Sequence, residues 1–381
     1  MMDAQEYQEL TKRALHLLEN KTCDLAEGVL RVKVSDYTDR EIAQSERAYL
    51  ESIPLPVLTT ARVRNPGDFE VRELLGRSLL ITRDGDGKAH VLLNYCRHRG
   101  AQVAKGAGNA RRFSCPYHDW TFDRGGQLVG RPAEHGFTGC PKSDLNLVEL
   151  ASEERLGFIW ARLDGEPRMD LSEHLGDFEA QLGYWSFEDY YYVNHGEYVV
   201  DGNWKAAVEA FSENYHFQYL HADSVVGQGA YSHVFTYDKY GKHHRLGIPL
   251  LSIEELEGVA MEEWPEGHHH VALLSLIFPT TAIAVGPFGL EVVEAFPTDE
   301  PGRCSFRHTF LARVPPTDEE EREGLLELFE EVHAVARDED LSTIVAVAKT
   351  AREGHLSEFV IGRNEPGVQN LQRELAALRL K

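Results

Sequence analysis

The chain has 381 residues, of which 42% are hydrophobic and 27% are charged, a composition typical of a soluble globular protein with two or three domains. Its formal net charge of −23 argues against nucleic acids and anionic membranes as partners. The longest apolar stretch, residues 271–286, is too short, and too interrupted by Pro279, for a membrane-spanning helix.

The first predicted element is an amphipathic helix over residues 4–19, where Tyr7, Leu10 and Ala14 recur at helical spacing. The residues before it include no basic or apolar leader, so no secretory signal is expected. From about residue 55 to 165 the pattern changes to short β-like runs, clearest at 78–82, 90–94 and 158–163. Asp84 to Gly87 forms a hairpin signal between the first two runs.

Two cysteine–histidine pairs interrupt this β-rich region. Cys96 and His98 form the first pair, and after sixteen intervening residues Cys115 and His118 form the second. Two thiolates can hold one iron and two imidazoles the other iron of a [2Fe-2S] cluster, which is the ligand set of a Rieske centre. A structural zinc site is the alternative, because two cysteines and two histidines also form a tetrahedral zinc site. The glycine-rich segment between the pairs favours the cluster.

The residues around both pairs, 94–100 and 115–120, resemble the cluster loops of Rieske-type ring-hydroxylating oxygenases. Asp119 stands where most members of that family have glycine. Asp is among the few residues that tolerate a positive φ, so we expect Asp119 to adopt one. Cys23, Cys140 and Cys304 remain as thiols without framework spacing, which predicts a reducing, cytoplasmic location.

Between Cys96 and Arg131 the chain carries seven basic residues and two acidic ones, against the acidic balance of the remainder. A solvated loop surface is one interpretation. The other is a docking patch for an acidic electron donor, since complementary charge speeds encounter. The basic residues are Arg97, Arg99, Lys105, Arg111, Arg112, Arg124 and Arg131.

After about residue 166 the sequence predicts a strand at 196–200, a helix at 201–220 and four strands at 271–278, 282–286, 290–296 and 304–314. Helices are predicted at 317–336, 338–353 and 371–380. This order indicates an α+β domain with helices on one sheet face. Residues 225–251 are expected to be loops. The histidines at 243–244 and 268–270 are interpreted as solvated.

A second metal site is suggested by His216 and His221, which are five residues apart. On a regular helix they would point about 140° apart, so both can face one metal only if the helix is irregular or ends between them. A surface or core histidine pair is the alternative. Two histidines and one carboxylate with open positions form the non-haem Fe(II) triad of oxygenases.

The resemblance to ring-hydroxylating oxygenases implies that His216 and His221 are iron ligands, with Glu213 as a bridge between the two redox centres. Most relatives have Asp at that position, and Glu resembles the branch that oxidises quaternary ammonium compounds. The third ligand implied is Asp340, with Asp338 as the fallback. Alternatively, these acids only stabilise a helix N-terminus.

The resemblance covers most of the chain and implies the catalytic alpha subunit of a Rieske non-haem iron oxygenase. The implied fold class is α+β, with a small all-β Rieske [2Fe-2S] domain and a helix-grip catalytic domain that binds Fe(II). The expected division is an N-terminal helical segment at 1–50 that packs on the catalytic domain, the Rieske domain at 51–165 and the catalytic domain at 166–381.

The implied activity uses dioxygen, and electrons relayed from NAD(P)H by a reductase, directly or through a ferredoxin, to hydroxylate an organic, aromatic small molecule. A homotrimer is implied, in which Glu213 links His118 of one chain to His216 of the next. Monooxygenation or demethylation of a quaternary ammonium or N-methyl compound is one alternative. A non-catalytic Rieske electron-transfer protein and a zinc-stabilised interaction protein are the others.

Overall fold

The computed structural model describes residues 4–224, 229–264, 270–300 and 302–379. Its contacts divide the chain into two compact units, one of residues 47–174 and 186–189, the other of the remainder. The boundaries expected from the sequence, after residues 50 and 165, differ by four and nine residues from the ends of the 47–174 segment. Among the described residues, no helix is long and apolar enough to cross a bilayer.

The smaller unit consists of three antiparallel sheets, as the short β-like runs predicted. Its hairpin of β4 and β5 is closed by the backbone N–H of Asp84, which donates to the carbonyl of Lys88 at 2.9 Å. The sheets have the orders β5-β4-β3-β6, β10-β11-β2 and β7-β8-β9. The strands are β2 (Leu55–Thr59), β3 (Asp68–Leu74), β4 (Arg77–Arg83), β5 (Ala89–Leu93), β6 (Ala107–Asn109), β7 (Phe113–Ser114), β8 (Thr121–Phe122), β9 (Leu128–Gly130), β10 (Ser152–Arg155) and β11 (Phe158–Ala161).

The larger unit is organised around a seven-stranded antiparallel sheet of order β12-β18-β17-β16-β15-β14-β13. The four strands predicted between 271 and 314 are confirmed, and nearly all of their residues, on both faces, are buried. The strands are β12 (Tyr191–Val200), β13 (Thr236–Tyr240), β14 (His243–Pro249), β15 (Val271–Ile277), β16 (Thr281–Val285), β17 (Gly289–Pro297) and β18 (Cys304–Ala312).

The expectation of loops over 225–251 is wrong from residue 236 onward, where β13 and β14 form a hairpin. His243 and His244 are therefore buried strand residues rather than solvated ones, and burial lowers the pKa of His244 to about 3. His270 is also buried, with Nδ1 at 2.9 Å from the carbonyl oxygen of Ser252. Residues 225–228, 268 and 269 lie outside the described part of the chain.

The single helix predicted over 201–220 is also wrong, because α5 (Trp204–Ala210) and α6 (Phe217–Leu220) are separate. Asn203 caps α5 as an N-cap residue. In the gap, the Glu213 carboxylate accepts the backbone N–H groups of Tyr215 and His216. A side chain that takes these donors competes with the helical ladder.

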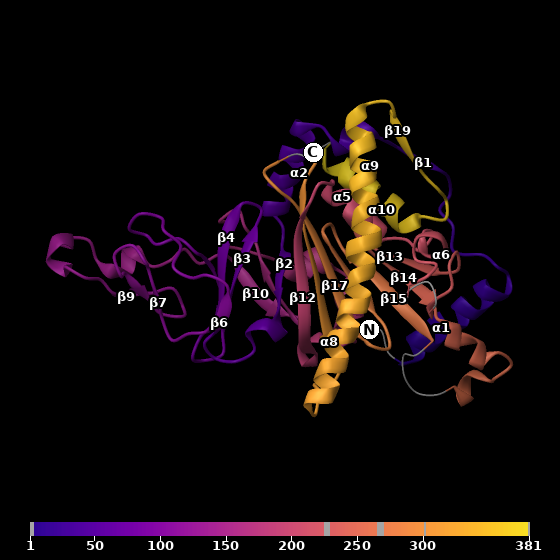
Figure 1. Ribbon diagram of the computed structural model, residues 1–381, viewed down its shortest axis with the longest axis horizontal. Helices are drawn as coiled ribbons and strands as arrows, with labels where there is room; N and C mark the ends of the chain where they lie inside the picture. The colour runs from indigo at the N-terminus through magenta and orange to yellow at the C-terminus, as the bar shows by residue number, and fades with distance from the viewer. Residues whose placement is uncertain (1–3, 225–228, 265–269, 301, 380–381) are drawn as a thin grey trace. The chain divides into compact units, whose positions relative to one another are not determined.

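Helices α8 (Glu319–Ala334) and α9 (Leu341–Glu353) form one continuous rod across a face of the large sheet (Figure 1). They were predicted as two helices, and a π-helical turn, Val335–Asp340, joins them. The rod begins where Asp318 accepts the backbone N–H of Glu321 at 2.9 Å, and the acidic residues 319–321 follow in the first turn, where negative charge stabilises a helix. It ends at Gly354, whose φ of 74° suits a helix C-terminus.

The remaining elements extend from both ends of the chain. The predicted N-terminal helix is confirmed as α1, and its Tyr7 hydroxyl donates to the carbonyl of Val271 at 2.7 Å. A two-stranded ribbon pairs β1 with β19, so segments more than 300 residues apart in sequence lie side by side. These elements are α1 (Ala4–Glu19), β1 (Leu30–Lys33), α2 (Arg40–Glu51), α3 (Leu171–Leu175), α4 (Phe178–Gly183), β19 (Glu358–Ile361) and α10 (Pro366–Leu378).

Candidate metal centres

The two cysteine–histidine loops of the smaller unit have the same backbone design. The Cys96 carbonyl accepts the backbone N–H of Gly100 at 2.9 Å, and the Cys115 carbonyl accepts that of Asp119, also at 2.9 Å. Gly100 has a φ of 78° and Asp119 a φ of 56°, so the predicted positive φ at Asp119 is confirmed. Asp119 therefore occupies the place in the second loop that glycine occupies in the first.

These loops bury the sulfurs and leave the imidazoles nearer the surface. Cys96 and Cys115 are 3% exposed and contact one another in the apolar core of the unit, where burial raises the pKa of the Cys96 thiol. The His98 and His118 rings lie 4.6 Å apart between centroids, and His98 stacks on Trp120. Two adjacent thiols below two adjacent imidazoles fit a [2Fe-2S] cluster with a sulfur-ligated and a histidine-ligated iron.

The seven basic residues near these loops do not form a uniform surface. Arg131 is buried, donates to Glu134 at 2.6 Å and lies over the Phe137 ring. The Arg124 Nε donates to the carbonyl of Ala110 at 3.0 Å. The exposed members are Arg97, Arg99, Lys105, Arg111 and Arg112.

In the larger unit, His216 and His221 flank the single turn α6. Because the helix ends before His216, both rings can turn to the same side, and their Nε2 atoms are 3.1 Å apart. Asp340, the last residue of the π-helical turn, brings its Oδ1 to 3.5 Å from His216 Nε2 and 3.3 Å from His221 Nε2. The structure thus brings together the three residues named from the sequence.

These three side chains fit a metal ion. Asp340 Oδ1 is buried and has no hydrogen-bond partner among the described residues, so it lacks the compensation that a buried carboxylate oxygen requires. Ligands at about 2.1 Å from one metal, on neighbouring positions, lie roughly 3 Å apart, close to the spacings observed. Two imidazoles and one carboxylate on one side are the facial set of non-haem iron sites.

Carboxylates also hold the outer nitrogen of each ring. His216 Nδ1 is hydrogen bonded to Glu213, and His221 Nδ1 lies 2.7 Å from Glu339 Oε2. An Nδ1–H donated to a carboxylate leaves Nε2 as the lone-pair nitrogen, which is the tautomer a metal ligand needs. Glu339 was not singled out from the sequence. Its signal was only its place in the acidic run that also contains Asp338 and Asp340.

Asp338, the fallback third ligand, is turned away from the histidines. Its carboxylate is more than half exposed and pairs with Arg337 at 2.5 Å.

The hydrogen bonds within the three-residue site shift the pKa values of its members. Burial by itself would lower the pKa of His216, but hydrogen bonds to Asp340 and Glu213 outweigh burial and raise it to about 9. Burial would raise the pKa of Asp340, and the two histidines outweigh it and lower it.

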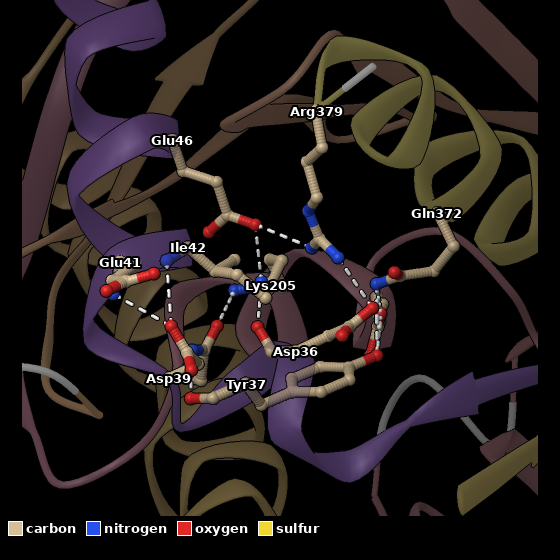
Figure 2. Close-up of polar contacts among 11 residues, drawn as sticks. Asp36, Tyr37, Asp39, Glu41, Ile42, Glu46, Lys205, Gln372 and Arg379 are labelled. Carbon is tan, nitrogen blue, oxygen red and sulfur yellow. Dashed lines mark hydrogen bonds and ion pairs between the residues drawn. The ribbon is translucent and has the colours of Figure 1, made fainter.

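A network of buried charges anchors the α5 helix that precedes the histidines (Figure 2). Lys205 is fully buried and donates to the Glu46 carboxylate and to the Asp36 carbonyl, each at 2.6 Å. Arg379 lies 3.0 Å from the same carboxylate, so two cations share Glu46. One turn later, Glu209 accepts the Tyr37 hydroxyl at 2.6 Å.

The three-residue site opens on a cavity of about 720 Å³ within the larger unit. This volume lies within the range of small-molecule sites. Most of the wall is apolar or small, and no lysine or arginine lines the cavity among the residues that the structure describes. Besides His216, His221 and Asp340, the polar residues of its wall are Ser252, Glu255, His270 and Glu291.

Comparisons with known proteins agree with this architecture. The family model "Ring hydroxylating alpha subunit (catalytic domain)" matches residues 187–379, and the model "Rieske [2Fe-2S] domain" matches residues 54–145. The Rieske match decides between the zinc and iron–sulfur interpretations in favour of the latter.

Individual curated proteins of this kind are also similar to the chain. The alpha subunit of benzene 1,2-dioxygenase from Pseudomonas putida is 31% identical over 206 residues, which are 49% of this chain and 43% of that protein. The chain thus spans less than half the length of such curated relatives.

Two solved structures share the fold over nearly the whole chain. The quaternary ammonium Rieske monooxygenase CntA superposes with a TM-score of 0.78 at 19% identity, covering 97% of this chain and 98% of that one. Naphthalene 1,2-dioxygenase from Rhodococcus sp. superposes with a TM-score of 0.74 at 19% identity, covering 100% and 99%. Since the catalytic-domain model spans more than half of the chain, this protein belongs to the ring-hydroxylating alpha-subunit family of Rieske non-haem iron oxygenases, whose cofactors are a [2Fe-2S] cluster and iron.

Proposed function

We propose that this protein is the terminal oxygenase component of an electron-transfer chain. It uses dioxygen, and electrons relayed from NAD(P)H through a reductase, to hydroxylate an aromatic substrate. The observation that carries this proposal is the convergence of His216, His221 and Asp340 on the wall of a large, mostly apolar cavity. A protein that only transferred electrons would need neither the three donors nor the cavity.

The proposed ligands of the cluster are Cys96, Cys115, His98 and His118, and those of the iron are His216, His221 and Asp340. When bound, the cluster supplies single electrons and the iron supplies the chemistry that activates dioxygen. Glu213 and Glu339 hold the Nδ1 protons of the two ligand rings and so fix their orientation. The apolar walls hold the substrate beside these side chains and exclude bulk water.

The proposed assembly is a homotrimer, and electrons reach it from a reductase, directly or through a ferredoxin. In this arrangement Glu213 bridges His216 of one subunit to His118 of its neighbour. Two observations support the proposal: Glu213 already holds the Nδ1 of His216, and His118 is exposed at the tip of its loop.

Oxidation of an N-methyl or quaternary ammonium compound is a second candidate. It is favoured by Glu255 and Glu291, two acidic residues in a cavity that no basic residue lines within the described part of the chain. Such a cavity suits neutral or cationic substrates, and it disfavours substrates that carry a carboxylate.

The test is to measure iron and sulfide in the purified protein, and then NADH and oxygen consumption with a reductase. We expect the two cluster irons and one further iron per chain, and consumption that depends on an aromatic compound. Consumption only with N-methylated amines would establish the second candidate. Cluster irons alone, with no substrate-dependent consumption, would establish a non-catalytic electron carrier.

A further inference from the structure

The Glu291 carboxylate occupies an unusual position in the wall of the cavity. The residue lies on β17, where it pairs with Ala284 of β16 and Phe310 of β18, and its side chain is 34% exposed. Its Oε2 lies 3.0 Å from Nε2 of His308, which is 1% exposed. Its Oε1 accepts no hydrogen bond from the residues that the structure describes. One oxygen is therefore held by the protein, while the other can take a donor in the cavity.

A buried chain of hydrogen bonds extends from this carboxylate through two further residues. His308 Nδ1 lies 3.1 Å from Nδ1 of His333, and His333 Nε2 lies 2.8 Å from the Tyr198 hydroxyl. Gly196 makes room for the ring of His333, because a Cβ at residue 196 would lie 2.2 Å from His333 Nε2. Residues from β12, β18 and α8 thus meet in one polar line inside an otherwise apolar layer.

The chain of hydrogen bonds has one consistent direction when Glu291 is ionised. An ionised carboxylate only accepts, so His308 donates from Nε2 and accepts at Nδ1. His333 then donates from Nδ1 and accepts the Tyr198 hydroxyl at Nε2. Burial lowers the pKa of His333 to about 4, which keeps that ring neutral near pH 7, as this pattern requires. Arg337, beside Tyr198, and Asp338 are the other charged groups near His333.

We infer that Glu291 is a specificity-determining residue, which accepts a hydrogen bond from a hydroxyl or amino group on an otherwise apolar, multi-ring substrate. The inference rests on the proposed function for the identification of the cavity as the substrate site. Two features support it. The buried hydrogen bonds preorganise one carboxylate oxygen as an acceptor, and a site built for a donor rejects analogues that lack it. No lysine or arginine in the described part of the wall competes for Glu291.

The test compares four probes of one ring skeleton: phenanthrene, hydroxyphenanthrene, aminophenanthrene and phenanthrenecarboxylate. Their dissociation constants are measured by fluorescence with the metal-loaded, full-length protein under anaerobic conditions, where no turnover occurs. We expect the hydroxy and amino probes to bind at least about tenfold more tightly than phenanthrene, and the carboxylate probe to bind more weakly. Glu291→Leu should remove the preference while leaving phenanthrene binding within about twofold.

Glu255→Gln is the matched control, because Glu255 lines the same cavity but is not in the chain of hydrogen bonds, and it should keep the preference. Glu291→Gln, which keeps the size of the side chain, repeats the test if the leucine variant does not fold, and it should weaken the preference. A native protein without the preference, or a Glu291→Leu protein that retains it, would overturn the inference. A preference in binding without any turnover would instead contradict the proposed function and leave the role of Glu291 standing.

Discussion

Asp338 and Asp340 are two residues apart in one acidic run, and the structure turns only Asp340 toward the histidines. The π-helical turn that ends at Asp340 places this residue at the wall of the cavity, whereas Asp338 pairs with Arg337 at the surface. We predict that Asp340→Ala lowers the affinity for the mononuclear iron by more than about a hundredfold. Loss of a residue that only hydrogen bonds to a metal ligand lowers metal affinity by about 10–100-fold, and loss of a ligand itself should lower it at least as much.

The matched control for that prediction is Asp338→Ala, which should keep full iron. The visible absorption of the Rieske cluster should be unchanged in both variants, and metal analysis after gel filtration measures the iron. Loss of iron in the Asp338 variant alone would identify Asp338, rather than Asp340, as the carboxylate ligand. If neither variant lost iron, the carboxylate ligand would be elsewhere.

The raised pKa of His216 predicts how iron binding depends on pH. With a pKa of about 9, the ring is protonated near pH 7 in the metal-free protein, and iron must displace that proton. The apparent affinity for Fe(II) should therefore rise by about tenfold per pH unit from pH 7 to pH 9 and then level off. Anaerobic titrations of the metal-depleted protein measure this. Glu213→Gln removes one of the two supporting charges, so its plateau should begin at a lower pH.

At the scale of elements, the helix that leads into the iron site depends on buried charges. Lys205 on α5 has no exposed surface, and its partner Glu46 lies on α2 (Figure 2). Burial lowers the pKa of Lys205, and the Glu46 charge opposes that shift. Removal of one partner from such a pair leaves the other charge buried and uncompensated, which is a strongly destabilising change.

We predict that Lys205→Met destabilises the larger unit by about 3–5 kcal/mol. Urea unfolding followed by far-UV circular dichroism measures the loss. The Rieske absorption serves as a separate probe of the smaller unit, and its midpoint should move much less. Lys349→Met is the matched control, since Lys349 is exposed on α9, and it should change stability by less than about 0.5 kcal/mol. Equal stability of the two variants would show that Glu46 is compensated by Arg379 alone.

At the scale of the whole molecule, the proposed trimer makes Glu213 the link between subunits. Glu213→Gln keeps the size of the side chain. It removes the negative charge that favours hydrogen bonds donated by the imidazoles of His216 and of His118 in the neighbouring subunit. Re-oxidation of the cluster on addition of substrate and oxygen should slow by at least about tenfold, or ~1.4 kcal/mol in the barrier, with both metals still bound. Glu213→Asp should recover part of the rate. A native rate in the glutamine variant would mean that the two centres communicate by another route.

The exposed arginines near the cluster predict where the electron donor docks. Reversal of Arg111 and Arg112 to Glu should raise the apparent KM for an acidic donor and flatten its dependence on salt. Single-turnover chemistry should be unchanged. Arg124→Glu is not a suitable control, because Arg124 holds a backbone carbonyl, so reversal of Lys12 on α1 serves instead. An unchanged KM would identify the arginines as an ordinary solvated surface.

Much of the fold and of both metal sites could be predicted from the sequence because the features concerned are local. The proposed cluster ligands lie within two short loops, and His216 and His221 are five residues apart, so the spacing of each pair already indicates a metal site. The positive φ of Asp119 follows from one residue in a tight turn. Strands between 271 and 314 are long apolar runs with turn residues between them, and their burial confirms the pattern.

Tertiary structure decided what depends on contacts between distant segments. His221 and Glu339 meet across 118 residues, and nothing local distinguishes Glu339 or Asp340 from Asp338. The hairpin at 236–249 is rich in polar residues, and the seven-stranded sheet, rather than its own pattern, buries His243 and His244. The chain of hydrogen bonds from Glu291 to Tyr198 joins three strands, β17, β18 and β12, and the helix α8. The two metal-binding motifs can be recognised in the sequence because a pair of donors within one loop needs no partner, whereas the proposed third iron ligand and the cavity exist only where packing brings separate elements together.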